Sequence, residues 1–124
     1  MRATATSPPD IRLRVRDAVA AADERKAMDL NVLELASVTD FTDFFMVCSA
    51  RNARQVQAIA DAIADALRKT GVKPLHVEGQ SNAHWVLLDY GDFVIHVFDV
   101  ETREYYGLER LWADAPDITA ELRE

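Results

Sequence analysis

The chain has 124 residues, of which 49% are hydrophobic and 28% are charged. This length suits one domain of ordinary size, and the composition suits a globular protein with a real core, which excludes a second enzymatic domain and wholesale disorder. No apolar run approaches the roughly 20 residues that cross a bilayer, and no secretory signal precedes residue 10. We therefore expect one domain over residues 1–124, cytoplasmic and without a membrane partner.

The net charge is −7, and the whole acidic excess lies near the C-terminal end. Residues 89–124 contain ten acids and three bases, whereas residues 1–88 are neutral overall. An acidic surface repels nucleic-acid phosphates and attracts basic proteins. We therefore expect a basic protein rather than DNA or RNA as the partner of this part of the chain. The plainer alternative is an acidic face that only keeps the protein soluble.

Apolar periodicity and cap residues predict helices alternating with short strands. The first helix is predicted over residues 10–26, after a Ser-Pro-Pro start. Asn52 and Gln55 have the spacing of a capping box, and they open a second helix that ends near Gly71. Short strands are predicted over residues 30–35, 44–48 and 74–78.

Two further apolar runs, residues 85–88 and 93–98, are predicted to form a β-hairpin. Four residues connect them, and the glycine among these, Gly91, tolerates the positive φ of a tight turn. Both strands are almost continuously apolar. We therefore expect both faces of each strand to be covered by protein, with a partner as one candidate cover.

The last part of the chain is predicted to be helical over part of residues 103–112, with Leu108, Leu111 and Trp112 holding this helix on the sheet. The order of elements indicates a single α/β domain with a mixed sheet of roughly five strands flanked by helices. Both ends of the chain, residues 1–9 and 115–124, are predicted to be loosely ordered.

The catalytic candidates reduce to one pair of carboxylates, because no Gly-rich phosphate loop, G-x-S-x-G or H-E-x-x-H motif is present. Asp99 and Glu101 follow an apolar strand, and carboxylates two residues apart on a strand point to one side and could share a divalent metal. Residues 79–81, Gly-Gln-Ser, faintly resemble a nucleotidyltransferase motif, although a strand follows them here instead of a helix. A solvated acid pair is the plainer interpretation.

The histidines and the single cysteine match no common zinc spacing, so we expect no metal and no cofactor. His96 alternates with apolar neighbours in a predicted strand. This leaves two interpretations open, a buried, hydrogen-bonded imidazole and a partner contact. Apolar residues precede Cys48, which favours a core thiol in a reducing compartment.

Both tryptophans and all three tyrosines fall within residues 85–112. Trp and Tyr dominate the residues that carry most of the energy of protein interfaces, but they also fill cores. We expect at least half of these five rings to be structural and the others to be interface candidates.

Three stretches follow one another in a characteristic order: W-V-L-L-D-Y-G-D at residues 85–92, H-V-F at 96–98 and L-E-R-L-W at 108–112. With shorter matches before them, they resemble the ribosome silencing factor family, also called the Iojap family, over residues 26–114. The resemblance implies a nucleotidyltransferase-like fold without its catalytic residues, and a translation repressor that is not an enzyme. The implied partner is the large ribosomal subunit, bound at ribosomal protein L14 so that the small subunit cannot join when nutrients are limited. A homodimer is implied for the free protein.

The resemblance also implies a partner-binding surface on the hairpin and on the residues that follow it. A basic ribosomal protein would gain association rate from the acidic charge and affinity from desolvated rings. Two alternatives stay open, a metal-dependent nucleotidyltransferase that uses Asp99 and Glu101, and a dimeric scaffold for another basic partner. The implied binding residues are Trp85, Leu87, Asp89, Tyr90, Val94, His96, Arg103 and Tyr106.

Overall fold

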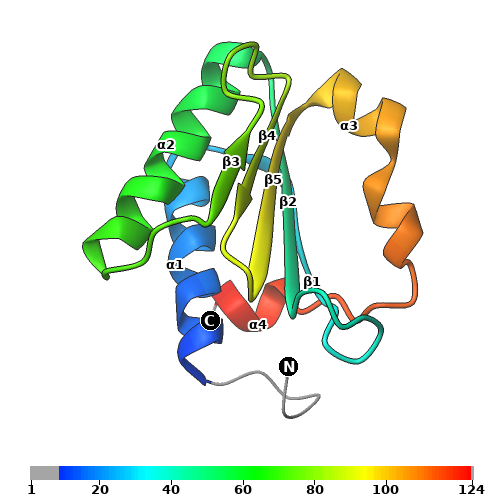
Figure 1. Ribbon diagram of the computed structural model, residues 1–124. Helices are drawn as coiled ribbons and strands as arrows, with labels where there is room; N and C mark the ends of the chain where they lie inside the picture. The colour runs from blue at the N-terminus through cyan, green and yellow to red at the C-terminus, as the bar shows by residue number, and fades with distance from the viewer. Residues whose placement is uncertain (1–8, 124) are drawn as a thin grey trace.

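A computed structural model describes residues 9–123, and its helices and strands alternate much as predicted (Figure 1). The residues before the first helix, for which a helix start and a loose end were predicted, lie outside this range. The helices are α1 (Pro9–Glu24), α2 (Ala53–Lys69), α3 (Val100–Tyr106), the 3-10 helix η1 (Leu108–Trp112) and α4 (Thr119–Arg123). The strands are β1 (Met28–Glu34), β2 (Phe44–Ala50), β3 (His76–Glu78), β4 (Trp85–Asp89) and β5 (Phe93–Asp99).

The five strands form one mixed sheet in the order β1-β2-β5-β4-β3. β2 and β5 are parallel, and every other neighbouring pair is antiparallel. A parallel pair needs a crossover connection, which here contains α2, β3 and β4. The prediction of an α/β fold with a mixed, roughly five-stranded sheet and flanking helices is confirmed.

α1 and α2 pack together on one face of the sheet, beside α4 (Figure 1). Asn52 caps α2 as predicted, because its Oδ1 accepts the backbone N–H of Gln55 at 2.9 Å. The return bond differs from a capping box, since Gln55 Oε1 accepts the N–H of Arg51 at 2.7 Å instead of that of Asn52. The apolar stripe of α2 is buried against the sheet through Val56, Ile59, Ala60, Ile63 and Leu67.

The opposite face of the sheet is covered, within residues 9–123, mainly by the segment from α3 to η1, which stands beyond β5 and β2 in Figure 1. β5 is buried on both faces, as predicted. β4 instead alternates, with Val86 and Leu88 buried and Trp85, Leu87 and Asp89 half-buried. Within residues 9–123, this face of β4 is therefore only partly covered, which leaves a partner as the candidate for the rest of the predicted cover.

Residues 103–112, predicted to be helical in part, belong to two helices with a break at Gly107. This glycine has a φ of +54°, in the left-handed region that commonly ends helices. Leu108 and Trp112 pack against the small hydrophobic cluster on this face, as predicted. Leu111 is 71% exposed, which corrects the prediction for that residue. Leu108 and Trp112 are half-buried while Leu111 faces solvent, so the three apolar side chains do not share one buried side.

Residues 115–123 fold back along β1, in contrast to the predicted loose end. The Ile118 N–H donates to the Val32 carbonyl at 2.9 Å, and both Ile118 and Leu122 are buried in the main core. Two apolar residues four apart share one face of a helix, and this short spacing is enough to dock α4. The acidic residues around them concealed this pattern in the sequence.

A hydroxyl at the start of α4 fastens this segment to the sheet. Thr119 Oγ1 accepts the buried N–H of Val32 at 2.8 Å. Thr119→Val keeps the shape but leaves that N–H without its acceptor, so we expect the free energy of unfolding to fall by about 1 to 3 kcal/mol. Denaturant unfolding measures the change, and Thr119→Ser, which keeps the hydroxyl, is the matched control. Equal stability of the valine variant and the native chain would contradict this role.

Candidate functional site

Five of the eight residues implied to bind a partner lie together on the sheet face opposite α1 and α2. β4 and β5 are antiparallel, and their register sets Trp85 beside Phe98 and Leu87 beside His96. Directly paired residues point to the same face of a sheet, so these positions form one patch. Its members from the implied set are Trp85, Leu87, Asp89, Val94 and His96.

β3 adds two polar side chains to this face that are not among the predicted binding residues. The register places His76 beside Asp89 and Glu78 beside Leu87, and the imidazole of His76 contacts the carboxylate of Glu78. The local sequence could not show that His76 and Glu78 lie on this face, because β3 has only three residues and its pairing with β4 is set by the tertiary structure. We define the open face as the accessible part of this surface, formed by His76, Glu78, Trp85, Leu87 and Asp89.

His96 holds Trp85 in place through a hydrogen bond. The indole Nε1–H of Trp85 donates to His96 Nδ1 at 2.9 Å, and the Trp85 ring stacks on Phe98 with centroids 4.8 Å apart. Burial lowers the pKa of His96 to about 4, so the ring is neutral near pH 7. This arrangement agrees with the first of the two interpretations, a buried, hydrogen-bonded imidazole. His96 positions the tryptophan and is not itself accessible.

Tyr106 extends the open face toward α3. Its ring lies over Trp85 with centroids 4.9 Å apart, and it is 54% exposed. Tyr105, Tyr106 and Trp85 line a cavity of about 640 Å³ together with polar residues that include the Glu101 carboxylate. Aromatic walls beside a carboxylate suit a cationic side chain. The sheet surface and this cavity are therefore continuous in position and similar in chemistry.

Arg103, another implied binding residue, is only 9% exposed. Its Nη1 donates to the Asp29 carbonyl at 2.7 Å and to Ser49 Oγ at 2.8 Å, and its Nε donates to Glu109 Oε2 at 3.1 Å. These bonds join α3 and η1 to β2 and to the start of β1. The geometry gives Arg103 a structural role and leaves it little surface for a partner.

Tyr90 lies on the other side of the sheet. It is 8% exposed and stacks on Phe93, with ring centroids 4.8 Å apart, in the core beneath the helices. Burial raises the pKa of Tyr90 to about 12. Tyr90 follows Asp89 directly, and successive side chains of an extended chain point to opposite faces. The structure thus separates Tyr90 from the other implied binding residues.

The catalytic alternative loses its geometric premise, because β5 ends at Asp99 and Glu101 lies on α3. The Asp99 carboxylate caps that helix by accepting the Thr102 N–H at 2.8 Å, and it also contacts His84 Nδ1 at 2.6 Å. Burial alone would raise the pKa of Asp99, but the hydrogen bonds from Thr102 and His84 outweigh it and lower that pKa. In the described part of the chain, no three His, Cys, Asp or Glu side chains are grouped to hold a metal.

Cys48 is buried in β2, and burial raises the pKa of its thiol to about 12. This agrees with the interpretation as a core thiol, since the reactive thiolate form is strongly disfavoured there. None of the helices between residues 9 and 123 is long and apolar enough to cross a bilayer.

The fold and the open face define a small α/β protein whose sheet has one helix-covered face and one partly uncovered face of rings and carboxylates. A family model described as "Ribosomal silencing factor during starvation" matches residues 8–124, and the chain belongs to this family. Among curated relatives, "Ribosomal silencing factor RsfS" of Bacillus subtilis is 42% identical over 99 residues, which cover 80% of this chain and 84% of that protein.

Relatives extend to plants, and the fold recurs in solved structures. "Protein Iojap, chloroplastic" of Zea mays is 35% identical over 98 residues, which cover 79% of this chain and 42% of that protein. A crystal structure of a protein from Chromobacterium violaceum superimposes with a TM-score of 0.81 at 32% identity, covering 83% of this chain and 86% of that one. These comparisons confirm the family that the hairpin motifs indicated.

Proposed function

We propose that this chain represses translation by binding the large ribosomal subunit at ribosomal protein L14, where its bulk prevents the small subunit from joining under nutrient limitation. The observation that carries the proposal is the open face, in a chain of the ribosomal silencing factor family. The proposed action is steric and needs neither a cofactor nor a catalytic group.

The chemistry of the open face suits a basic protein surface. Trp85 and Tyr106 offer apolar area that is already held in place by ring contacts, so little side-chain freedom is lost on binding. Glu78 and Asp89 flank the exposed side of Leu87 and can pair with lysine or arginine side chains. In the free protein, the same face is our candidate for the homodimer contact.

The proposal is tested by placing a positive charge at the centre of the open face. Leu87 is half-buried, so in Leu87→Arg the long side chain can extend to solvent while its charge opposes a basic partner. We expect co-sedimentation with purified large subunits to weaken at least 10-fold. We also expect the variant to lose its ability to stop small subunits from joining in a reconstituted assay.

Leu13→Arg is the matched control, because Leu13 is an exposed leucine on α1, on the other side of the sheet. It should leave both assays unchanged. Thermal unfolding of both variants shows whether each is folded. If folded Leu87→Arg still binds large subunits and blocks joining as the native chain does, the open face is not the binding surface.

A further inference from the structure

A basic corner lies where the end of α1 meets the start of α2. Arg25 and Lys26 come from the turn after α1, and Arg51 and Arg54 come from the junction of β2 and α2. All four side chains are exposed. They line an open depression of about 530 Å³ with Asn52, Gln55 and Ala58, and no acidic residue contributes to this lining.

Gln55 ties the two basic segments together. Its Nε2 donates to the carbonyls of Arg25 and Lys26 at 3.3 Å, and its Oε1 accepts the Arg51 N–H at 2.7 Å. Both chain segments are therefore fixed relative to each other by one side chain. The backbone positions that carry the four cations are therefore held close together by the fold.

The arginines of this corner also differ from most others in the chain. Of the ten arginines that the structure describes, five form ion pairs with carboxylates and Arg16 donates to backbone carbonyls. Arg25, Arg51 and Arg54 form no ion pair and no side-chain hydrogen bond with residues 9–123. Glu24 is the adjacent acid, but it lines a separate depression with Asp17 and Lys69.

We propose that the basic corner, Arg25, Lys26, Arg51 and Arg54, binds the phosphodiester backbone of an RNA segment. Clustered cations without carboxylate partners repel one another, and phosphates relieve that repulsion while releasing their own counterions. The depression offers no aromatic ring and only Ala58 as an apolar side chain, so it lacks the anchors typical of a protein interface and the platforms that stack bases. The choice of RNA over DNA rests on the proposed function.

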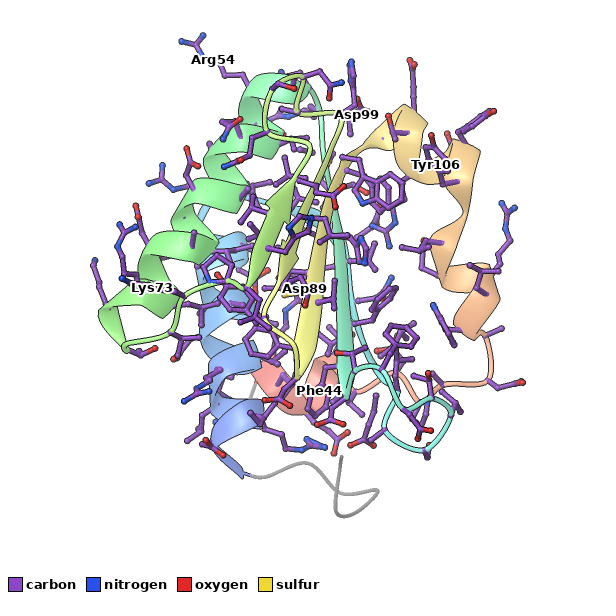
Figure 2. All side chains as sticks on the ribbon, viewed as in Figure 1. Phe44, Arg54, Lys73, Asp89, Asp99 and Tyr106 are labelled. Atoms are coloured by element: carbon purple, nitrogen blue, oxygen red, sulfur yellow. The ribbon has the colours of Figure 1, made fainter. Side chains whose placement is uncertain are left out.

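The basic corner and the open face lie on different parts of the molecule, so both can contact the large ribosomal subunit at once. Figure 2 shows Arg54 projecting outward at one end of α2, away from Asp89 on the sheet. The acidic C-terminal part of the chain repels phosphates, so an RNA strand would be confined to the basic corner. The chain would then hold a basic protein with its open face and a neighbouring RNA with the corner.

The test measures fluorescence anisotropy of a labelled 20-base-pair RNA duplex with the full chain at several KCl concentrations. Native chain should bind at 50 mM KCl, and Arg51→Gln/Arg54→Gln should bind at least 10-fold more weakly. Each lost phosphate contact lowers the magnitude of the slope of log K against log salt by about 0.7 to 0.9, so we expect a decrease of about 1.5 for the double variant. Arg110→Gln is the control, since Arg110 is an exposed arginine outside the corner.

Three results would overturn the inference: no binding by the native chain at 50 mM KCl, equal binding by the native chain and the double variant, or equal loss in Arg110→Gln. Displacement of the RNA by poly-glutamate at equal charge concentration would also overturn it, because it would indicate a site for any acidic polymer. The outcome is separate from that of the proposed function. The duplex assay contains no ribosomal protein, so its result does not depend on whether the open face binds the large subunit.

Discussion

Arg103→Met is expected to lower the free energy of unfolding by about 3 kcal/mol, the low end of the range for breaking a buried ion pair. The guanidinium is buried and donates three hydrogen bonds, to Glu109, Ser49 and the Asp29 carbonyl. Methionine fills a similar volume but leaves Ser49 and the Asp29 carbonyl without their donor and Glu109 without its counter-charge. Urea unfolding followed by circular dichroism measures the change.

One further variant and a binding assay separate a structural role of Arg103 from a role in recognition. Glu109→Gln keeps a hydrogen-bond acceptor for Arg103 and should cost less than Arg103→Met, because Glu109 is partly exposed. The sequence resemblance implied that Arg103 contacts the partner. If Arg103→Met unfolds like the native chain but loses binding to large subunits, that implication is right and the structural role is not.

The stability of the protein should fall by about 3 kcal/mol as the pH decreases from 6.5 to 4, because of His96 alone. Burial lowers the pKa of His96 to about 4 in the folded chain, against 6.5 for the exposed side chain. In this pH range the unfolded chain binds a proton at His96 and the folded chain does not, so protonation favours unfolding. Well above pH 6.5 both forms are neutral and the contribution is complete.

The prediction is checked by urea unfolding across this pH range, with His96→Gln as the comparison. Glutamine can accept the indole N–H of Trp85 but does not titrate, so its slope of stability against pH should be smaller even if the variant is less stable overall. The ring resonances of His96 followed by NMR give its pKa directly. A value near 6.5 in the folded chain would contradict the burial argument.

Elements with a strong local pattern were predicted correctly. The stripe of α2 repeats at helical spacing and lies behind a capping residue, and the structure places this helix within two residues of the predicted end. The hairpin was also located from its apolar runs, and Gly91 adopts the expected positive φ of +85°. Its connection has three residues between the strands instead of four, because β4 extends to Asp89.

Elements whose order depends on distant contacts were not predictable in the same way. The segment that ends in α4 contributes only Ile118 and Leu122 to the core. Its stability comes from docking against α1 and β1, which are about 100 residues away in the chain. The strand β5 was predicted over residues 93–98, and the paired-carboxylate alternative assumed strand-like spacing of Asp99 and Glu101, but the carboxylate of Asp99 caps α3 instead. The same residue type fits both roles, and only the surrounding backbone decides between them.

Local patterning was thus sufficient for the family and the fold class, since apolar spacing, turn residues and the hairpin motifs are carried by neighbouring residues. Only the tertiary structure decided how the implied binding residues divide between the two faces of the sheet. Trp85 and Tyr90 are five residues apart in one hairpin, yet they lie on opposite faces of the sheet, and His76 joins Asp89 only through strand pairing. The physical reason is that burial and exposure are set by which segments pack on each face, and this depends on contacts between residues far apart in the chain.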